Sequence, residues 1–216
     1  MNDTDYSLTW LKTVCKTVKA LSRTANGETA TAYNGDKPEL LIQNPTELTE
    51  RAEWNLAEAA MHVFMFGEAI RADPVHILSF MNAVAQKVSA KIFPQQASPW
   101  RTWDTRKKYP QQVPPSQIEK DMMRLSTCLA NKFRDFKQHD PVEMAALLER
   151  ELDWGIHPWA DGCGRSAKIL GAWILFKARL LPATFTDREE YYRSMNSTVA
   201  NWVAYYRRHV QSKVSA

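Results

Sequence analysis

Glycine is scarce in this sequence, at seven of its 216 residues. The chain also lacks internal repeats and low-complexity tracts, which excludes a repeat array. Its eight tryptophans accompany long stretches in which apolar residues recur every three or four positions. That spacing is typical of helices with one buried face. The sequence therefore predicts a mainly helical protein.

Cysteine is also scarce: Cys15, Cys128 and Cys163 are widely spaced and form no C-x-x-C pair. This odd set fits reduced thiols in a cytosol better than a disulfide framework. The N-terminus lacks the apolar core and small-residue cleavage site of a secretory signal, and no segment approaches about 18 to 20 uninterrupted apolar residues. We therefore expect a soluble, cytoplasmic protein, or one delivered into a host cell without a cleavable signal peptide.

The sequence has no strong excess of one charge sign. Lysine plus arginine number 28 against 24 for aspartate plus glutamate, which gives a net charge of +4 and a pI near 8.9. Such mild basicity favours a solvated surface over a nucleic-acid patch, so neither nucleic acid nor membrane is expected as a partner. The length suits one packed domain with an N-terminal extension. We assign residues 1–44 to an amphipathic helix and polar linker, and residues 45–216 to the main domain.

Helical periodicity recurs along the chain. From Tyr6 to Arg23, apolar residues at spacings of three and four predict a basic amphipathic helix, docked on the main body rather than on a membrane. Further helices are expected after Pro45, over 74–92, 116–136 and 142–154, from about Gly164 until Pro182, and from Thr186 past Tyr206 as one long helix. Five prolines within 93–115 exclude a continuous helix there. Between them, Trp100–Tyr109 is consistent with one short β-hairpin.

The segment from His157 to Lys168 has the sequence H-P-W-A-D-G-C-G-R-S-A-K. Gly162 and Gly164 allow a tight turn and a close approach of the backbone to a ligand. The apolar run 169–176 indicates a helix that begins just after this turn. The free N–H groups and the positive dipole end of such a helix favour anions. The sequence therefore predicts a phosphate site at a helix N-terminus.

Three ionisable side chains give this predicted site its chemistry. Arg165 supplies a planar cation that suits phosphate oxygens. Asp161 supplies a hard oxygen ligand for Mg²⁺, which usually bridges protein carboxylates and substrate phosphates, although this residue could instead cap the following helix. His157 is a candidate general base.

The segment resembles the signature of the Fic (Fic/Doc) family, H-P-F-x-[D/E]-G-N-G-R-x-x-R. The histidine, proline, aspartate, both glycines and the first arginine match, whereas Trp159 stands for Phe, Cys163 for Asn and Lys168 for Arg. The surrounding chain resembles a Fic core from about Glu53 to Ser197, with a proline-flanked flap before the motif and Tyr191-Tyr192 after it.

This resemblance implies an all-α, Fic-like helical domain with one short β-hairpin flap. It implies Mg²⁺-dependent transfer of AMP from ATP, as the substrate, to a Ser, Thr or Tyr hydroxyl of a target protein. His157 and Arg165 would be catalytic, with His157 as general base, and Asp161 would bind the metal. Nucleotide binding would fall to Asp161, Gly162, Cys163, Gly164, Arg165, Lys168 and Tyr192.

The departures from the signature leave alternatives open. Cys163 has only a weak S–H donor where the family has an amide, and Lys168 keeps a charge but loses the planar fork of arginine. The donor could be another phosphate compound, or the chain could be a non-catalytic Fic module that binds nucleotide or a partner. The Doc branch, which transfers a γ-phosphoryl group, has lysine where Gly164 stands, and this argues against that chemistry.

The resemblance also implies protein partners. The target would dock along the flap near Trp100–Tyr109 by strand addition. The family's inhibitory pattern, [S/T]-x-x-x-E-[G/N], has no full match. Inhibition would then come from a separate inhibitor protein, as in a toxin-antitoxin pair, or be absent in that form. The sequence leaves the oligomeric state open.

Overall fold

The computed structural model describes residues 3–21, 41–42, 44–93, 98–106 and 109–210. This part of the chain is built from α-helices and has no β-strand longer than an isolated bridge, which confirms the all-α prediction. The α-helices are α1 (Asp3–Leu21), α2 (Pro45–Phe66), α3 (Pro74–Ser89), α4 (Ile118–Arg134), α5 (Pro141–Arg150), α6 (Cys163–Lys177), α7 (Arg188–Met195) and α8 (Val199–His209). Within the same residues, none of the helices combines the length and apolarity that crossing a membrane requires.

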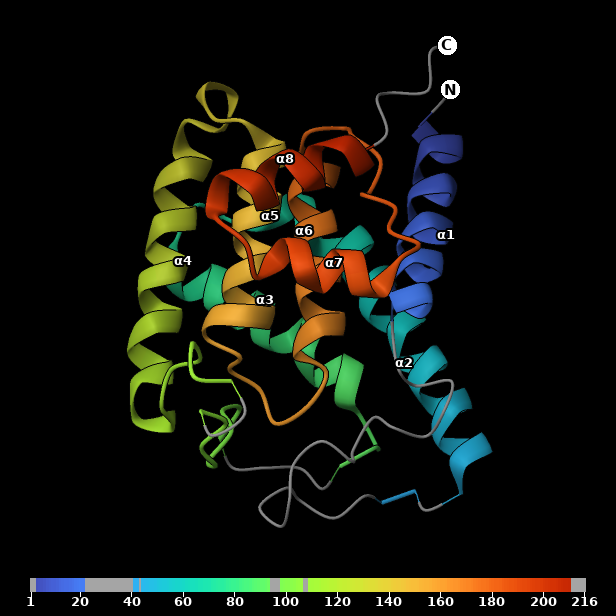
Figure 1. Cartoon of the computed structure of the whole chain (residues 1–216). Coiled ribbons are helices and arrows are strands. Elements are labelled where there is room, and N and C mark those ends of the chain that lie inside the picture. The colour runs from blue at the N-terminus through green and yellow to red at the C-terminus, as the bar shows by residue number, and fades with distance from the viewer. Residues whose placement is uncertain (1–2, 22–40, 43, 94–97, 107–108, 211–216) are drawn as a thin grey trace.

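Helix α6 lies at the centre of the fold (Figure 1). Every residue from Ile169 to Phe176 in this helix is buried. A helix that is apolar nearly all round has to be enclosed by other elements, and α1, α2, α3 and α5 all pack against it. The N-terminus of α6, where the phosphate site is predicted, is thereby held by a well-packed core.

Side-chain caps set where several helices begin. Asp73, Asp140 and Asp187 accept hydrogen bonds from N–H groups in the first turns of α3, α5 and α7. Thr198 does the same for α8. These caps correct one sequence prediction, because the segment after Thr186 forms two helices rather than one. Asp187 and Thr198 each offer a side-chain oxygen that favours a new helix start over continuation.

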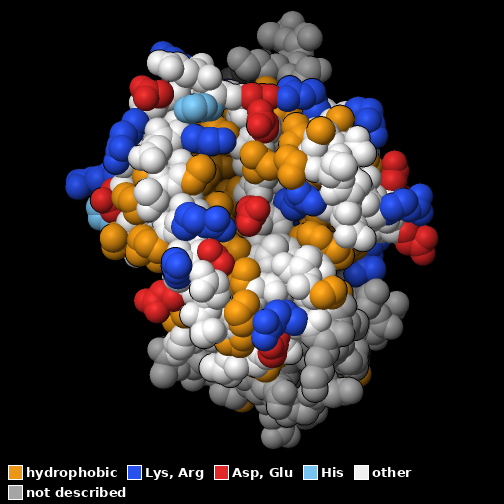
Figure 2. Space-filling model, turned by 60° about the vertical axis from the view of Figure 1, so that its left-hand side comes forward, with side chains coloured by type: hydrophobic (Ala, Val, Ile, Leu, Met, Phe, Trp, Pro, Cys, Tyr) orange, Lys and Arg blue, Asp and Glu red, His pale blue; other side chains and the backbone are white. Residues whose placement is uncertain are grey.

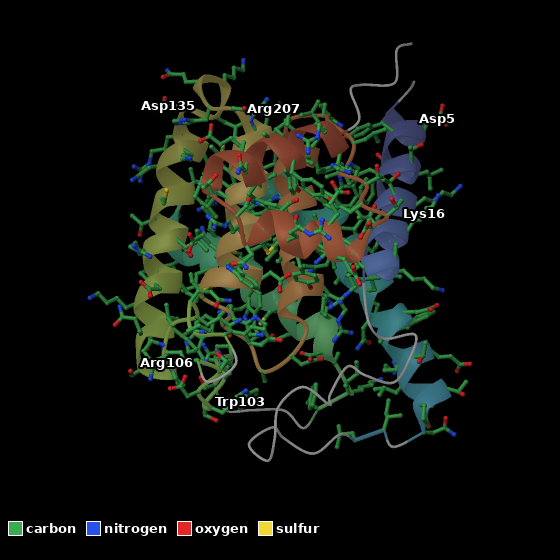
Figure 3. All side chains as sticks on the ribbon, in the orientation of Figure 1. Asp5, Lys16, Trp103, Arg106, Asp135 and Arg207 are labelled. Atoms are coloured by element: carbon green, nitrogen blue, oxygen red, sulfur yellow. The ribbon has the colours of Figure 1, made fainter. Side chains whose placement is uncertain are left out.

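Helix α1 is docked on the main body, as its sequence pattern predicts. Tyr6 and Trp10 are buried, and their ring centroids lie 5.9 and 5.0 Å from that of Phe176 in α6. Lys16 on the opposite face of α1 points outward (Figure 3). The apolar face of α1 thus belongs to the same core as α6. Most of the expected linker, residues 22–40 and 43, lies outside the described residues, so the boundary between 44 and 45 stays a prediction.

The segment expected to form a hairpin lies beside the motif instead. Its described residues, 100–106 and 109, form no paired strands with one another, and Trp100 makes a single antiparallel bridge with Trp159. The reason is that the Arg101 N–H donates to the Pro158 carbonyl at 2.9 Å, so the motif takes the backbone group that a hairpin would use. The hairpin prediction is corrected for these residues. Figure 3 shows Trp103 at the end of the bundle opposite Asp135 and Arg207.

Candidate active site

The motif begins with a strained backbone. Helix α5 continues into a π-helical turn, Glu151–Gly155. His157 follows with a φ of 48°, a left-handed value that is uncommon outside glycine. Its ring Nδ1 lies 2.9 Å from the carbonyl oxygen of Asp153. Because a carbonyl only accepts, Nδ1 carries the proton of the neutral ring, and Nε2 is the nitrogen that can take up another.

His157 lines a cavity of about 520 Å³, which we call the histidine cleft. Its walls come from the π-helical turn, the motif, α7 and the segment that follows Trp103. The lining residues are Tyr109, Gln112, Asp153, Trp154, His157, Arg188, Glu189, Tyr192 and Arg193. The structure therefore brings Tyr192 to the same cavity as His157. The Arg188 guanidinium lies 4.8 Å from the centre of the Tyr192 ring, so one wall combines an aromatic face with a cation.

Asp161 lines a second cavity, of about 320 Å³, between the motif and the end of α3. Its carboxylate pairs with Arg165 at 2.6 Å, and the two side chains are only 10% and 9% exposed. Nη1 of Arg165 has no hydrogen-bond partner within the described part of the chain. The predicted base and the predicted metal ligand thus face different cavities.

Gly162 makes the turn that the sequence predicts. It is the N-cap of α6, with φ 72° and ψ 12°, and a Cβ added there would lie 2.7 Å from Cγ1 of Val88. Both the backbone angle and the space therefore require glycine. No side chain caps the first turn of α6. The first N–H groups of that helix, with the positive end of its dipole, are groups of the kind that bind anions at helix N-termini.

The Cys163 thiol closes this turn from inside. Its sulfur accepts a hydrogen bond from the N–H of Trp159 and donates one to the carbonyl of the same residue, each at 3.3 Å. Burial raises the pKa of the thiol well above its usual range, so the thiol stays neutral. Since the side chain is 2% exposed, Cys163 offers a ligand its backbone N–H rather than its sulfur. Trp159 is itself in the core and donates from Nε1 to Asn82 at 3.0 Å.

Lys168 is turned into the protein. Its ammonium lies 3.5 Å from an Asp153 carboxylate oxygen, donates to the Gly164 carbonyl at 3.1 Å and lies 4.4 Å from the centre of the Tyr191 ring. The residue is 6% exposed. It lines a small cavity beside α1, together with Glu149, and not the histidine cleft. In this structure Lys168 compensates buried carboxylates.

The sequence analysis missed three buried charged residues around the motif: Arg101, Glu149 and Asp153, which are 1%, 1% and 6% exposed. The sequence pattern could have revealed the burial of two of them. Glu149 and Asp153 follow the buried Ala145 at intervals of four residues, which places charged side chains on the core face of one helix. Arg101 lies in the irregular flap segment, where no periodicity could reveal its burial.

Known proteins are similar to this chain in sequence and in fold. No family model matches the chain. A curated protein named "Protein adenylyltransferase Fic", from Nematostella vectensis, is 33% identical over 117 residues, which are 52% of this chain and 26% of that protein. A Fic-domain-containing signaling protein from Bacteroides thetaiotaomicron has a TM-score of 0.67 at 14% identity, over 97% of this chain and 87% of that one. The chain is thus similar to a Fic protein in sequence over about half of its length, and to Fic-domain structures in fold.

A second solved structure, Fic-1 from C. elegans, has a TM-score of 0.61 at 19% identity, over 97% of this chain and 61% of that one. At these identities the solved structures show the fold. The matched residues span only about a quarter, 26%, of the length of the curated relative.

Proposed function

We propose that this protein is a member of the Fic family and transfers AMP from ATP to a hydroxyl side chain of a target protein, in a reaction that requires Mg²⁺. The name of its curated relative supports adenylyl transfer in general. The observation that carries the proposal is the hydrogen bond from Nδ1 of His157 to the Asp153 carbonyl. This bond fixes the ring and leaves Nε2 as the basic nitrogen on a residue that lines the histidine cleft.

In the proposed reaction, the hydroxyl oxygen of the target attacks the α-phosphorus of ATP. A bond forms between these two atoms, the bond from the α-phosphorus to the oxygen bridging it to the β-phosphorus breaks, and pyrophosphate leaves. Nε2 of His157 accepts the hydroxyl proton. A base positioned in this way contributes roughly 10²- to 10⁴-fold in rate. The Asp153 carbonyl continues to accept from Nδ1 while the ring is positively charged.

The phosphates of the donor would bind at the N-terminus of α6. The N–H groups of the Gly162–Gly164 turn are held by core packing, so they need no reorganisation when negative charge develops. Arg165 would add a cation, because its Nη1 has no partner in the described structure. Tyr192 and Arg188 line the histidine cleft on α7 and would contact the rest of the nucleotide.

Mg²⁺ would be held by Asp161 together with phosphate oxygens of ATP. Among the described residues, no group of three or more His, Cys, Asp or Glu side chains could hold a metal ion. A single carboxylate still fits, because Mg²⁺ is usually bound through one or two carboxylates plus substrate phosphates. The ion would supply neutralisation of phosphate charge. Arg165, now paired with Asp161, would turn to the phosphates when both bind.

A second candidate function is nucleotide or partner binding without transfer. It is favoured by the pairing of Asp161 with Arg165 at 2.6 Å and by the burial of Lys168 against Asp153. Arg165 and Lys168, which the family resemblance assigns to the nucleotide, are thus each paired with a carboxylate inside the protein. A module of this kind would bind the donor and leave it intact.

The two candidates differ in a labelling experiment. The protein is incubated with a cell lysate and ATP labelled at the α- or the γ-phosphate, with Mg²⁺ or with a chelator. His157→Ala removes the proposed base. His76→Ala, an exposed residue of α3 outside both cavities, is the matched control. We expect protein to be labelled by α-labelled ATP and not by γ-labelled ATP. This labelling should require Mg²⁺, and it should be lost in His157→Ala but not in His76→Ala. Binding of ATP without any label would favour the second candidate, and γ-label would contradict AMP transfer.

A further inference from the structure

Arg101 connects the flap segment to the motif through a set of backbone contacts. Its guanidinium donates to the carbonyls of His157 at 2.7 Å, Trp103 at 2.7 Å, Val113 at 2.5 Å and Ile156 at 3.3 Å. The side chain is 1% exposed. One buried cation thus ties together three stretches of backbone: the start of the flap segment, its end and the residues at the predicted base.

Arginine is suited to this task by its chemistry. The guanidinium carries five N–H donors in a rigid plane, whereas lysine offers three on a flexible stem. The bonds to the carbonyls of Trp103 and Ile156 are buried, and these two acceptors would otherwise need another partner. The backbone reinforces the same link, because the Arg101 N–H donates to the Pro158 carbonyl at 2.9 Å and Trp100 bridges to Trp159.

The link acts where the backbone is strained. His157 has a φ of 48°, and a non-glycine residue keeps such a conformation only when its surroundings over-determine it. Arg101 fixes the carbonyls of His157 and of Ile156, on the two sides of that strained residue. The Nδ1 bond to Asp153 fixes its ring. Removing Arg101 would free the backbone to relax and carry the imidazole with it.

We infer that Arg101 is a positioning residue for His157, and that it holds the base and the flap segment in one fixed arrangement. The inference deepens the proposed function and rests on it, because it assigns Arg101 no contact with donor or target. A target docked on the flap would meet Nε2 of His157 at a constant position. A displacement of about 1 Å at a reacting group can reduce a rate by about 100-fold.

The test compares Arg101→Met and Arg101→Lys with the wild-type chain. The control Arg124→Met removes an exposed arginine of α4 that pairs with Asp121 on the same helix. Donor affinity is measured with ATP by calorimetry, transfer with α-labelled ATP, and the tautomer of His157 by nitrogen NMR of the imidazole. Thermal unfolding shows whether each variant keeps a cooperative fold.

We expect Arg101→Met to lower the transfer rate about 100-fold, with the dissociation constant for ATP within about threefold of wild type. In the same variant, the NMR signal of a protonated Nδ1 should give way to a mixture of tautomers. Arg101→Lys should recover about tenfold of the lost rate, because lysine can still donate to some of the carbonyls. Arg124→Met should match wild type in every measurement.

The inference is overturned if folded Arg101→Met keeps the wild-type tautomer and rate, or if rate and ATP affinity fall together by the same factor. If Arg101→Met does not fold, the same criteria apply to Arg101→Lys, which retains the charge. The NMR readout separates the two proposals. A wild-type chain without transfer contradicts the proposed function, while the effect of Arg101 on the His157 tautomer can still be measured.

Discussion

The hydroxyl of Tyr191 donates a hydrogen bond to the carboxylate of Glu149 beneath the motif. Glu149 is 1% exposed and Tyr191 is fully buried. Burial raises the pKa of Glu149 to about 7, although the charge of Lys168 and the tyrosine hydrogen bonds act in the opposite direction. One buried carboxyl group, beside Gly171 in the middle of α6, can therefore change its charge near neutral pH.

Glu149→Gln should remove a pH dependence of stability. The pKa of Glu149 is raised from 4.5 to about 7 on folding, so between these values the folded state binds more protons than the unfolded state. Stability from this group is thus fully present below pH 4.5 and is lost as the pH rises through 7. The unfolding free energy of wild type, relative to Glu149→Gln, should fall by at most about 1.4 kcal/mol per pH unit in this window.

Urea unfolding of wild type and Glu149→Gln at several pH values from 4.5 to 8 gives the difference between their unfolding free energies. Glu143→Gln, an exposed glutamate on the same helix, is the control and should follow wild type. If the unfolding free energy of wild type relative to Glu149→Gln rose with pH, Lys168 and the tyrosines would be keeping Glu149 ionised in the folded protein, and the prediction would be wrong.

Cys163→Asn should raise transfer. The thiol bridges the N–H and the carbonyl of Trp159, and an amide can make both bonds with stronger donor and acceptor atoms. About 1 kcal/mol of extra hydrogen bonding corresponds to roughly a fivefold change in an equilibrium, so we expect a gain of about that size in the labelling rate. Cys128→Asn, on the exposed side of α4, serves as the control. Equal or lower activity would show that this turn has adapted to the thiol.

The sequence predicts the helices well where one periodic face meets one core. Helix α1 and the central α6 follow from apolar spacing alone, and the core clusters confirm both. The break between α7 and α8 is not predicted from the sequence. The hydroxyl of Thr198 accepts a hydrogen bond from the N–H of Asn201 at 3.2 Å, and nothing in the local sequence pattern distinguishes this threonine from other polar residues. Caps compete with helix continuation by about 1 kcal/mol, which periodicity does not reveal.

The candidate site was predicted in part. Gly162 and the N-terminus of α6 follow from local chemistry, and the structure shows the left-handed turn. The direction of a side chain depends on contacts that are distant in sequence. Lys168 points toward Asp153 rather than the histidine cleft for that reason, since two buried carboxylates lie fifteen and nineteen residues before it in the chain.

Lys168→Met should reduce stability and leave the relative affinity for ATP and ADP almost unchanged. The ammonium compensates the buried Asp153 carboxylate, and removing one partner of a buried ion pair costs about 3 kcal/mol. The ratio of the two dissociation constants should stay within about threefold of wild type. A cation that gripped the terminal phosphate would contribute about 1.5 to 3 kcal/mol, and its loss would change that ratio by tenfold or more. Calorimetry with ATP and with ADP distinguishes these outcomes, and Lys177→Met, on the same helix, is the control.

Gly162→Ala should destabilise the protein and weaken donor binding together. The residue has a φ of 72°, and an added Cβ would lie 2.7 Å from Cγ1 of Val88. A left-handed alanine alone costs about 1 to 2 kcal/mol, and the clash adds to it. Because the turn at Gly162 aims the N–H groups at the start of α6, relaxing the strain should also turn those groups away from the phosphates.

Gly155→Ala is the matched control for that prediction. A Cβ there would lie 3.1 Å from Oε2 of Glu151, which is the far end of a flexible side chain that can move aside. We expect Gly155→Ala to stay within about 0.5 kcal/mol of wild type and to bind ATP normally. If Gly162→Ala lost stability but kept wild-type affinity for ATP, the phosphates would be bound somewhere other than the N-terminus of α6.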